Sequence, residues 1–226
     1  MQSPQELMYR WRQHFTADKG EEVSTHSAQL TEQEMLLVLQ PQTEHGSVLT
    51  ALREATAEQH RKLEERFDAV SELADMHRRP QVIARYAAFY SSAFAALGPE
   101  LEPLHELRFK HRRQAWEAVN MLQASADCAT GFPAPADLRE ALGSFYVVEG
   151  SILGGRFIQA QLKKQDVEAA ELAFLNPYGT AGGSMWRSLL SAIEEHGSGD
   201  LGIAAICRGA TRAFDHAEFV LCGGTK

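Results

Sequence analysis

The chain has 226 residues, of which 44% are hydrophobic, and a formal net charge of -8 at pH 7. This length and apolar content suffice for one buried core, while the acidic balance argues against nonspecific binding to nucleic acid or anionic membranes. No apolar run approaches the length of a membrane span, and the first residues lack the apolar centre of a secretory signal. We therefore expect a cytoplasmic protein whose partners are small molecules or other proteins.

The first 46 residues predict two short helices, over 5–15 and 31–40, on either side of a polar stretch. The second opens with the capping pair Thr31 and Glu34 and stops before Pro41. Neither helix carries a motif that points to chemistry. We interpret residues 1–46 as an N-terminal helical extension of unknown role, followed by a single domain over 47–226.

A strongly helical pattern begins at Ser47, a plausible N-cap residue. The residues that follow it at steps of three or four form one stripe facing a core: Leu49, Leu52, Thr56, His60, Leu63 and Phe67.

Further helices are expected over 80–97, 101–124, 135–165, 183–196 and 199–221. Clusters of turn-forming residues at 98–99, 131–133 and 176–179 separate them. No segment shows the alternating pattern of a strand, so the predicted fold class is all-α.

One residue of the inward stripe is a histidine. In that register the imidazole of His60 needs a hydrogen-bonding partner or a metal. Position alone favours a hydrogen-bonded core histidine over a metal ligand. Arg53, two turns earlier on nearly the same face, is either a solvated flank or a cation for the anionic edge of a ligand centred at His60.

The segment 145–158 is apolar enough to be a buried helix, yet it contains Gly150, Gly154 and Gly155. Each interior glycine costs about 1 kcal/mol relative to alanine. Gly150 and Gly154 share a face, which allows a flat ligand or another helix to approach the backbone closely. Taken alone, the glycines favour tight packing between helices over a ligand.

The segment 52–60, LREATAEQH, resembles the proximal-helix motif of heme oxygenases, and 146–155, YVVEGSILGG, resembles their distal-helix motif, especially in its bacterial versions. The two motifs agree in order and spacing, and the resemblance covers residues 48–221. It implies a heme oxygenase-like helical fold in which haem lies between the proximal and distal helices.

The resemblance assigns roles to the residues discussed above. It makes His60 the proximal iron ligand, and it matches Arg53 and Tyr146 to positions that hold the haem propionates. Gly150, Gly154 and Gly155 match the glycines over the distal face.

The sequence also departs from the family pattern. Ser151 stands where many members carry an aspartate that organises distal water, and Ala57 where mammalian relatives have a second basic residue. Arg208 and Arg212, on the last predicted helix, are candidates for a further cation.

The activity implied by the resemblance is oxidative cleavage of haem to biliverdin, carbon monoxide and ferrous iron, with haem as both cofactor and substrate. His60 would bind the iron on one side and leave the other open for O2, with Glu64 as a candidate acceptor for the second imidazole nitrogen. Gly150 and Gly154 would form the sparse distal wall, and Glu149 and Ser151 are candidates for supporting a water network that delivers protons.

Electrons must come from an external donor such as a ferredoxin or a reductase, since no flavin or NAD fingerprint is visible. Arg61, Lys62 and Arg66 flank the proposed ligand and form either a basic docking face or an ordinary solvated surface. The charge run at 110–113 is interpreted as an exposed surface.

Two other functions remain open. A haem-binding protein on the same fold could store, sense or transfer haem without degrading it. A di-iron carboxylate oxidase would need two Glu-x-x-His motifs, whereas only Glu102 to His105 has this spacing, interrupted by Pro103.

Overall fold

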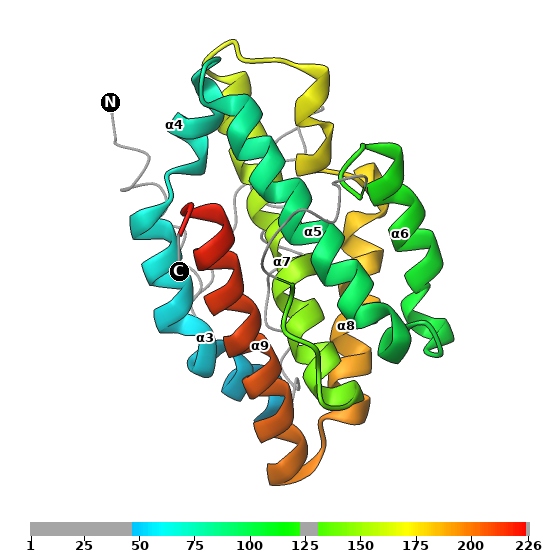
Figure 1. Ribbon diagram of the computed structural model, residues 1–226. Coiled ribbons are helices and arrows are strands. Elements are labelled where there is room, and N and C mark those ends of the chain that lie inside the picture. The colour runs from blue at the N-terminus through cyan, green and yellow to red at the C-terminus, as the bar shows by residue number, and fades with distance from the viewer. Residues whose placement is uncertain (1–46, 123–130, 225–226) are drawn as a thin grey trace, which may run out of the picture. The chain divides into compact units, whose positions relative to one another are not determined.

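The computed structural model describes residues 47–122 and 131–224 (Figure 1). Within these residues the chain is entirely helical and contains no strand, which confirms the all-α prediction. No helix in this part of the chain combines the length and the apolar character needed to cross a membrane. The two helices predicted before residue 47 lie outside the described residues.

Seven α-helices and three short 3-10 helices follow one another in the described residues. In chain order they are α3 (Ser47–Arg66), α4 (Ala69–Ala74), α5 (Arg79–Leu101), η1 (His105–Leu107), α6 (Phe109–Ala118), α7 (Leu138–Lys163), η2 (Ala170–Leu175), η3 (Gly179–Ala181), α8 (Gly182–His196) and α9 (Gly199–Leu221).

Helix α7 is the central element and packs against α5, α8 and α9, while α9 also packs along α3 (Figure 1). Helices α7 and α9 cross at very short range because glycines stand at the contact. A Cβ atom on Gly143 would lie 1.9 Å from the Ile206 carbonyl oxygen, and one on Gly209 would lie 2.1 Å from the Glu140 carbonyl oxygen. The Ser144 hydroxyl donates to the Gly209 carbonyl at 3.0 Å and secures the same crossing. This contact aligns α7, which carries most of the predicted site.

The C-terminal helices agree well with the sequence prediction. Helix α9 spans the predicted 199–221, and α8 begins one residue before the predicted 183–196. Helix α7 begins at Leu138, because Asp137 caps it by accepting the backbone N–H of Glu140 at 2.9 Å.

The break predicted at residues 98–99 is wrong, because α5 runs through Gly98 and Pro99 to Leu101. Leu97 and Leu101 are both fully buried, so the last turn gains more from packing than the proline costs. A Cβ on Gly98 would lie 3.5 Å from the aromatic ring of Phe109, which is an ordinary contact distance.

The single helix predicted over 101–124 is also wrong. The chain turns after Leu101, forms η1, and starts α6 only after Arg108, which adopts the left-handed conformation with φ 51°. Glu102, directly before Pro103, keeps helical dihedrals, and the chain leaves helical geometry at Leu104, which is extended with φ -80° and ψ 96°. The short helix α4 was not predicted; Asp68 caps it by accepting from the Ser71 N–H at 3.1 Å.

Candidate functional site between helices α3 and α7

The inward stripe of α3 is buried in its first half and open in its second. Leu49, Leu52 and Thr56 are at most 4% exposed. Beyond them the His60 side chain is 45% exposed, and Leu63 and Phe67 are partly exposed. His60 therefore occupies the core register of its helix without being enclosed by the core.

Two neighbours orient the His60 ring. Its Nδ1 lies 3.3 Å from Oε1 of Glu64, the residue predicted as its partner. Its ring also meets the ring of Phe214 on α9 edge-on, with centroids 5.7 Å apart. Because Nδ1 faces the carboxylate, a bond from this ring to a metal would use Nε2.

Tyr146, Gly150 and Gly154 follow one another at steps of four along α7 and form what we call the glycine face. A Cβ on Gly150 would meet only the Trp186 ring, at 3.7 Å, which is an ordinary contact distance. A Cβ on Gly154 would meet no described atom within 4 Å. Packing among the described residues therefore does not explain Gly154.

Arg53 and Tyr146, both predicted to hold propionates, are brought together across α3 and α7. Burial raises the pKa of the Tyr146 hydroxyl, and a hydrogen bond and the charge of Arg53 oppose this rise. The contact places a guanidinium and a hydroxyl at one end of the glycine face.

Two other predicted residues, Gly155 and Ser151, contact neighbouring elements beside this face. A Cβ on Gly155 would lie 2.5 Å from the Leu175 carbonyl oxygen, so close packing against η2 accounts for this glycine. The Ser151 hydroxyl donates to the Val148 carbonyl at 2.5 Å and lies 2.8 Å from the Tyr90 hydroxyl of α5. Ser151 and Tyr90 thus form a hydroxyl pair beside Gly150.

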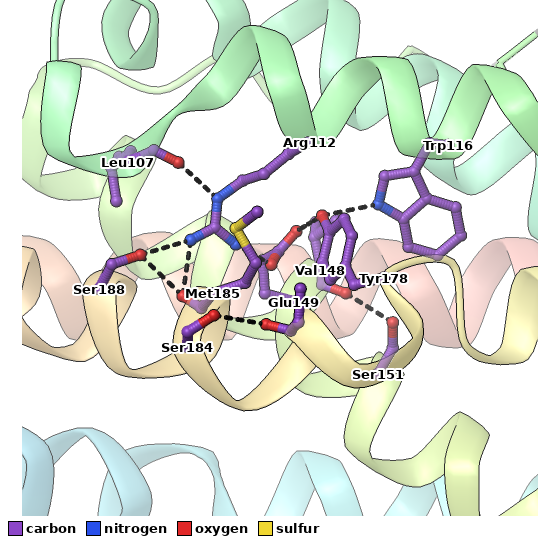
Figure 2. Close-up of polar contacts among 11 residues, drawn as sticks. Leu107, Arg112, Trp116, Val148, Glu149, Ser151, Tyr178, Ser184, Met185 and Ser188 are labelled. Carbon is purple, nitrogen blue, oxygen red and sulfur yellow. Dashed lines mark hydrogen bonds and ion pairs between the residues drawn. The ribbon is translucent and has the colours of Figure 1, made fainter.

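Glu149 belongs to a buried polar group that we call the arginine cluster, shown in Figure 2. Its members are Arg112, Trp116, Glu149, Tyr178 and Ser188. One Glu149 carboxylate oxygen pairs with the Arg112 guanidinium, and the other accepts from the Tyr178 hydroxyl at 2.6 Å. Burial raises the pKa of Glu149, and Arg112 opposes that shift.

Arg112 binds three further acceptors besides Glu149. Its Nε donates to the Leu107 carbonyl at 2.6 Å, and one Nη donates to the Met185 carbonyl at 2.6 Å and to the Ser188 hydroxyl at 2.9 Å (Figure 2). A fully buried charge with this many fixed acceptors connects α6, α7 and α8.

The interpretation of residues 110–113 as exposed surface is wrong for Arg112, which has no exposed side-chain surface. The signal was present in the sequence: Phe109, Arg112 and Trp116 lie at helical spacing, and all three are buried on α6. Arg112 occupies an inward stripe just as His60 does.

The other candidate cations are bound elsewhere. Arg208 and Arg212 of α9 both reach Glu140, at 3.2 and 3.1 Å, near the start of α7. On α3, Arg61 pairs with Glu58 and Glu65, and Arg66 pairs with Glu218. The helix surface beside His60 therefore mixes both signs of charge, which favours the solvated-surface interpretation.

The described residues contain one group whose side chains could share a metal ion, formed by Glu106, Glu195 and His196, with ligand atoms within 4.8 Å of one another. It lies at the surface and lacks the paired Glu-x-x-His helices of a di-iron centre. Glu102 and His105 lie at the end of α5 and in η1, so they do not share a helix.

Comparison of the chain with models of protein families, with curated proteins and with solved structures found no match.

Proposed function

We propose that this protein is a heme oxygenase-type monooxygenase that binds haem between α3 and α7 and cleaves it to biliverdin, carbon monoxide and ferrous iron. Two observations carry the proposal: α7 has a bare stretch at Gly154, and α3 presents His60 partly exposed from its core stripe. Two independent sequence motifs thus correspond to two surfaces with the chemistry that a flat iron porphyrin requires.

The described residues fit haem in three respects. His60 has an imidazole oriented by the Glu64 carboxylate, which is the usual second contact of a metal-binding histidine. Gly154 leaves room for a flat group against the helix backbone. Arg53 and Tyr146 offer a cation and a hydroxyl for the propionates.

When bound, haem supplies the iron at which O2 is reduced, with electrons from an external donor such as a ferredoxin or a reductase. The chain's own contribution is to orient the ring and control its surroundings. No described atom lies within 4 Å of a Cβ on Gly154, so no described acidic or basic side chain contacts the face at that point. The hydroxyl pair of Ser151 and Tyr90 lies beside Gly150 and can orient water there.

Glu149 has a different role in this proposal from the one the sequence predicts. Both of its oxygens are already bound inside the arginine cluster, by Arg112 and Tyr178. We assign it to holding α7 in place, and we assign the orientation of water to Ser151.

The test is a titration of the purified protein with hemin, followed by addition of reductant in air. We expect a one-to-one complex with a sharpened Soret band, and then conversion to the absorption spectrum of biliverdin. His60→Ala should change the ferric spectrum and reduce the rate of conversion at least about a hundredfold, because the iron loses its protein ligand. The matched control His196→Ala, at a partly exposed histidine at the end of α8, should leave the spectrum unchanged.

Stable binding of hemin without conversion under several electron donors would instead identify a haem carrier on the same scaffold. An unchanged ferric spectrum in His60→Ala would reject the ligand assignment.

A further inference from the structure

The glycine face is not equally bare along its length. At Gly150 the outer ring atoms of Trp186 lie 3.7 and 3.9 Å from the position of a Cβ, and the same ring packs against Tyr146 with centroids 5.2 Å apart. At Gly154, one turn later, no described atom lies within 4 Å. Trp186 therefore covers the glycine face at Gly150, whereas no described residue covers it at Gly154.

The guanidinium of Arg112 fixes the position of Trp186. Arg112 binds the backbone carbonyl of Met185, which directly precedes Trp186, and the carboxylate of Glu149, which directly precedes Gly150. Figure 2 shows this side chain reaching from α6 toward both helices. Arg112 thus sets the separation of α7 and α8 at the place where the indole meets the glycine face.

We infer that Trp186 determines the regiospecificity of haem cleavage, as a side wall that limits where the ring can lie, and that Arg112 is the positioning residue that holds this wall. The inference rests on the proposed function. A flat ring over Gly154 cannot slide toward Gly150 past a buried indole, which is 8% exposed and packed on Tyr146. The lateral position and rotation of the ring decide which of its edges is oxidised, and therefore which isomer of biliverdin forms.

The first test varies the wall itself. Trp186→Phe shortens the side chain, and Trp186→Ala removes it. Biliverdin isomers are separated by chromatography after turnover with a chemical reductant, and hemin affinity and the circular dichroism of the Soret band are measured in parallel. We expect the isomer ratio to shift on the order of tenfold in Trp186→Ala and less in Trp186→Phe. A single unchanged isomer in both variants would overturn the inference.

The second test removes the buried ion pair that is proposed to position Trp186. Arg112→Met combined with Glu149→Leu removes both buried charges together and preserves bulk, so the variant should remain folded. We expect the isomer ratio to shift in the same direction as in Trp186→Phe, with an unfolding midpoint close to that of the unmodified protein. Wild-type isomers from this variant would reject the role of Arg112.

A matched control is available on the same helix. Glu140 is another buried glutamate of α7 that binds arginines, and it stands at the far end from Gly154. Glu140→Gln should lower stability without changing the isomer ratio.

Failure of the proposed function is recognised separately. An unmodified protein that does not bind hemin overturns both proposals. Binding without cleavage overturns the enzymatic activity alone, and the wall is then tested by the Soret circular dichroism, which must change in Trp186→Ala for the inference to survive.

Discussion

Two sides of helix α7 each carry a residue that is unusual in a core, and the two residues differ in how their surroundings are filled. Toward α6 and α8, Glu149 brings a charge inside, and Arg112 and Tyr178 bind both of its oxygens. On the glycine face, Gly154 brings no side chain at all, and no described atom occupies the space. Contacts among the described residues explain the first side and do not explain the second, and this difference is why we propose a ligand there.

The comparison also separates glycines that look alike in the sequence. Gly143 and Gly155 stand where neighbouring backbone approaches to 1.9 and 2.5 Å of a virtual Cβ, so packing alone requires them. Gly154 has no such requirement. An interior glycine that costs about 1 kcal/mol without a packing reason is better evidence for a binding surface than a glycine-rich motif as such.

The largest effect is expected on the charged side. Arg112→Met leaves the Glu149 carboxylate buried with only Tyr178, and we expect a loss of about 3 to 5 kcal/mol in the free energy of unfolding. The double variant Arg112→Met with Glu149→Leu should lose much less than this. Urea denaturation of the haem-free proteins measures both. Equal losses in the single and double variants would show that the buried Glu149 carboxylate is not what destabilises Arg112→Met.

The next effect tests the packed glycine. Gly155→Ala places a Cβ against the Leu175 carbonyl, which must move, so we expect destabilisation by about 1 to 3 kcal/mol. The midpoint of thermal unfolding without haem provides the measurement. A variant as stable as the unmodified protein would mean that η2 can move away from α7 at little cost in free energy.

At Gly154, one residue earlier, we expect the substitution by alanine to raise the stability. Gly154→Ala meets no described atom and improves helix propensity, so the haem-free protein should gain up to about 1 kcal/mol. Its affinity for hemin should fall, because the new methyl group occupies the space proposed for the ring. If Gly154→Ala is stabilised but binds hemin with unchanged affinity, the ring does not occupy the space beside Gly154.

The smallest effect concerns a buried polar group that, unlike Glu149, has no hydrogen-bond partner among the described residues. Nε2 of His216 on α9 is buried without one, and the Phe89 and Phe132 rings flank the imidazole. Burial lowers the pKa of His216 below its ordinary value of 6.5. The unfolded chain therefore takes up more protons as the pH falls below about 6.5, and the folded state loses stability there.

His216→Leu tests this expectation, because it should flatten the dependence of the unfolding midpoint on pH between about 7 and 5. The same slope in the unmodified protein and the variant would assign the acid sensitivity to other groups.

Much of the fold could be predicted from periodicity, since long helices with a clear apolar stripe, such as α9, need no tertiary information. The predicted helix boundaries were wrong where local sequence signals compete with packing. Pro99 looks like a helix terminator, yet the burial of Leu97 and Leu101 carries α5 past it. The extended Leu104 and the left-handed Arg108 divide a stretch that composition alone presents as continuous.

The sequence by itself determined that the described part of the chain is helical and that a histidine and several glycines occupy inward registers. It also indicated the partner of His60, because Glu64 lies one helical turn away. Contacts within one helix follow from spacing, and these are the ones that could be read in advance.

The tertiary structure alone decided which of these residues meet one another. It bound Arg112 to Glu149, joined Arg53 to Tyr146, and packed Gly155 while leaving Gly154 bare. The physical reason is that burial and pairing between helices depend on how the helices are rotated and how closely they approach. That geometry is set by packing throughout the bundle, and a stripe on one helix does not contain it.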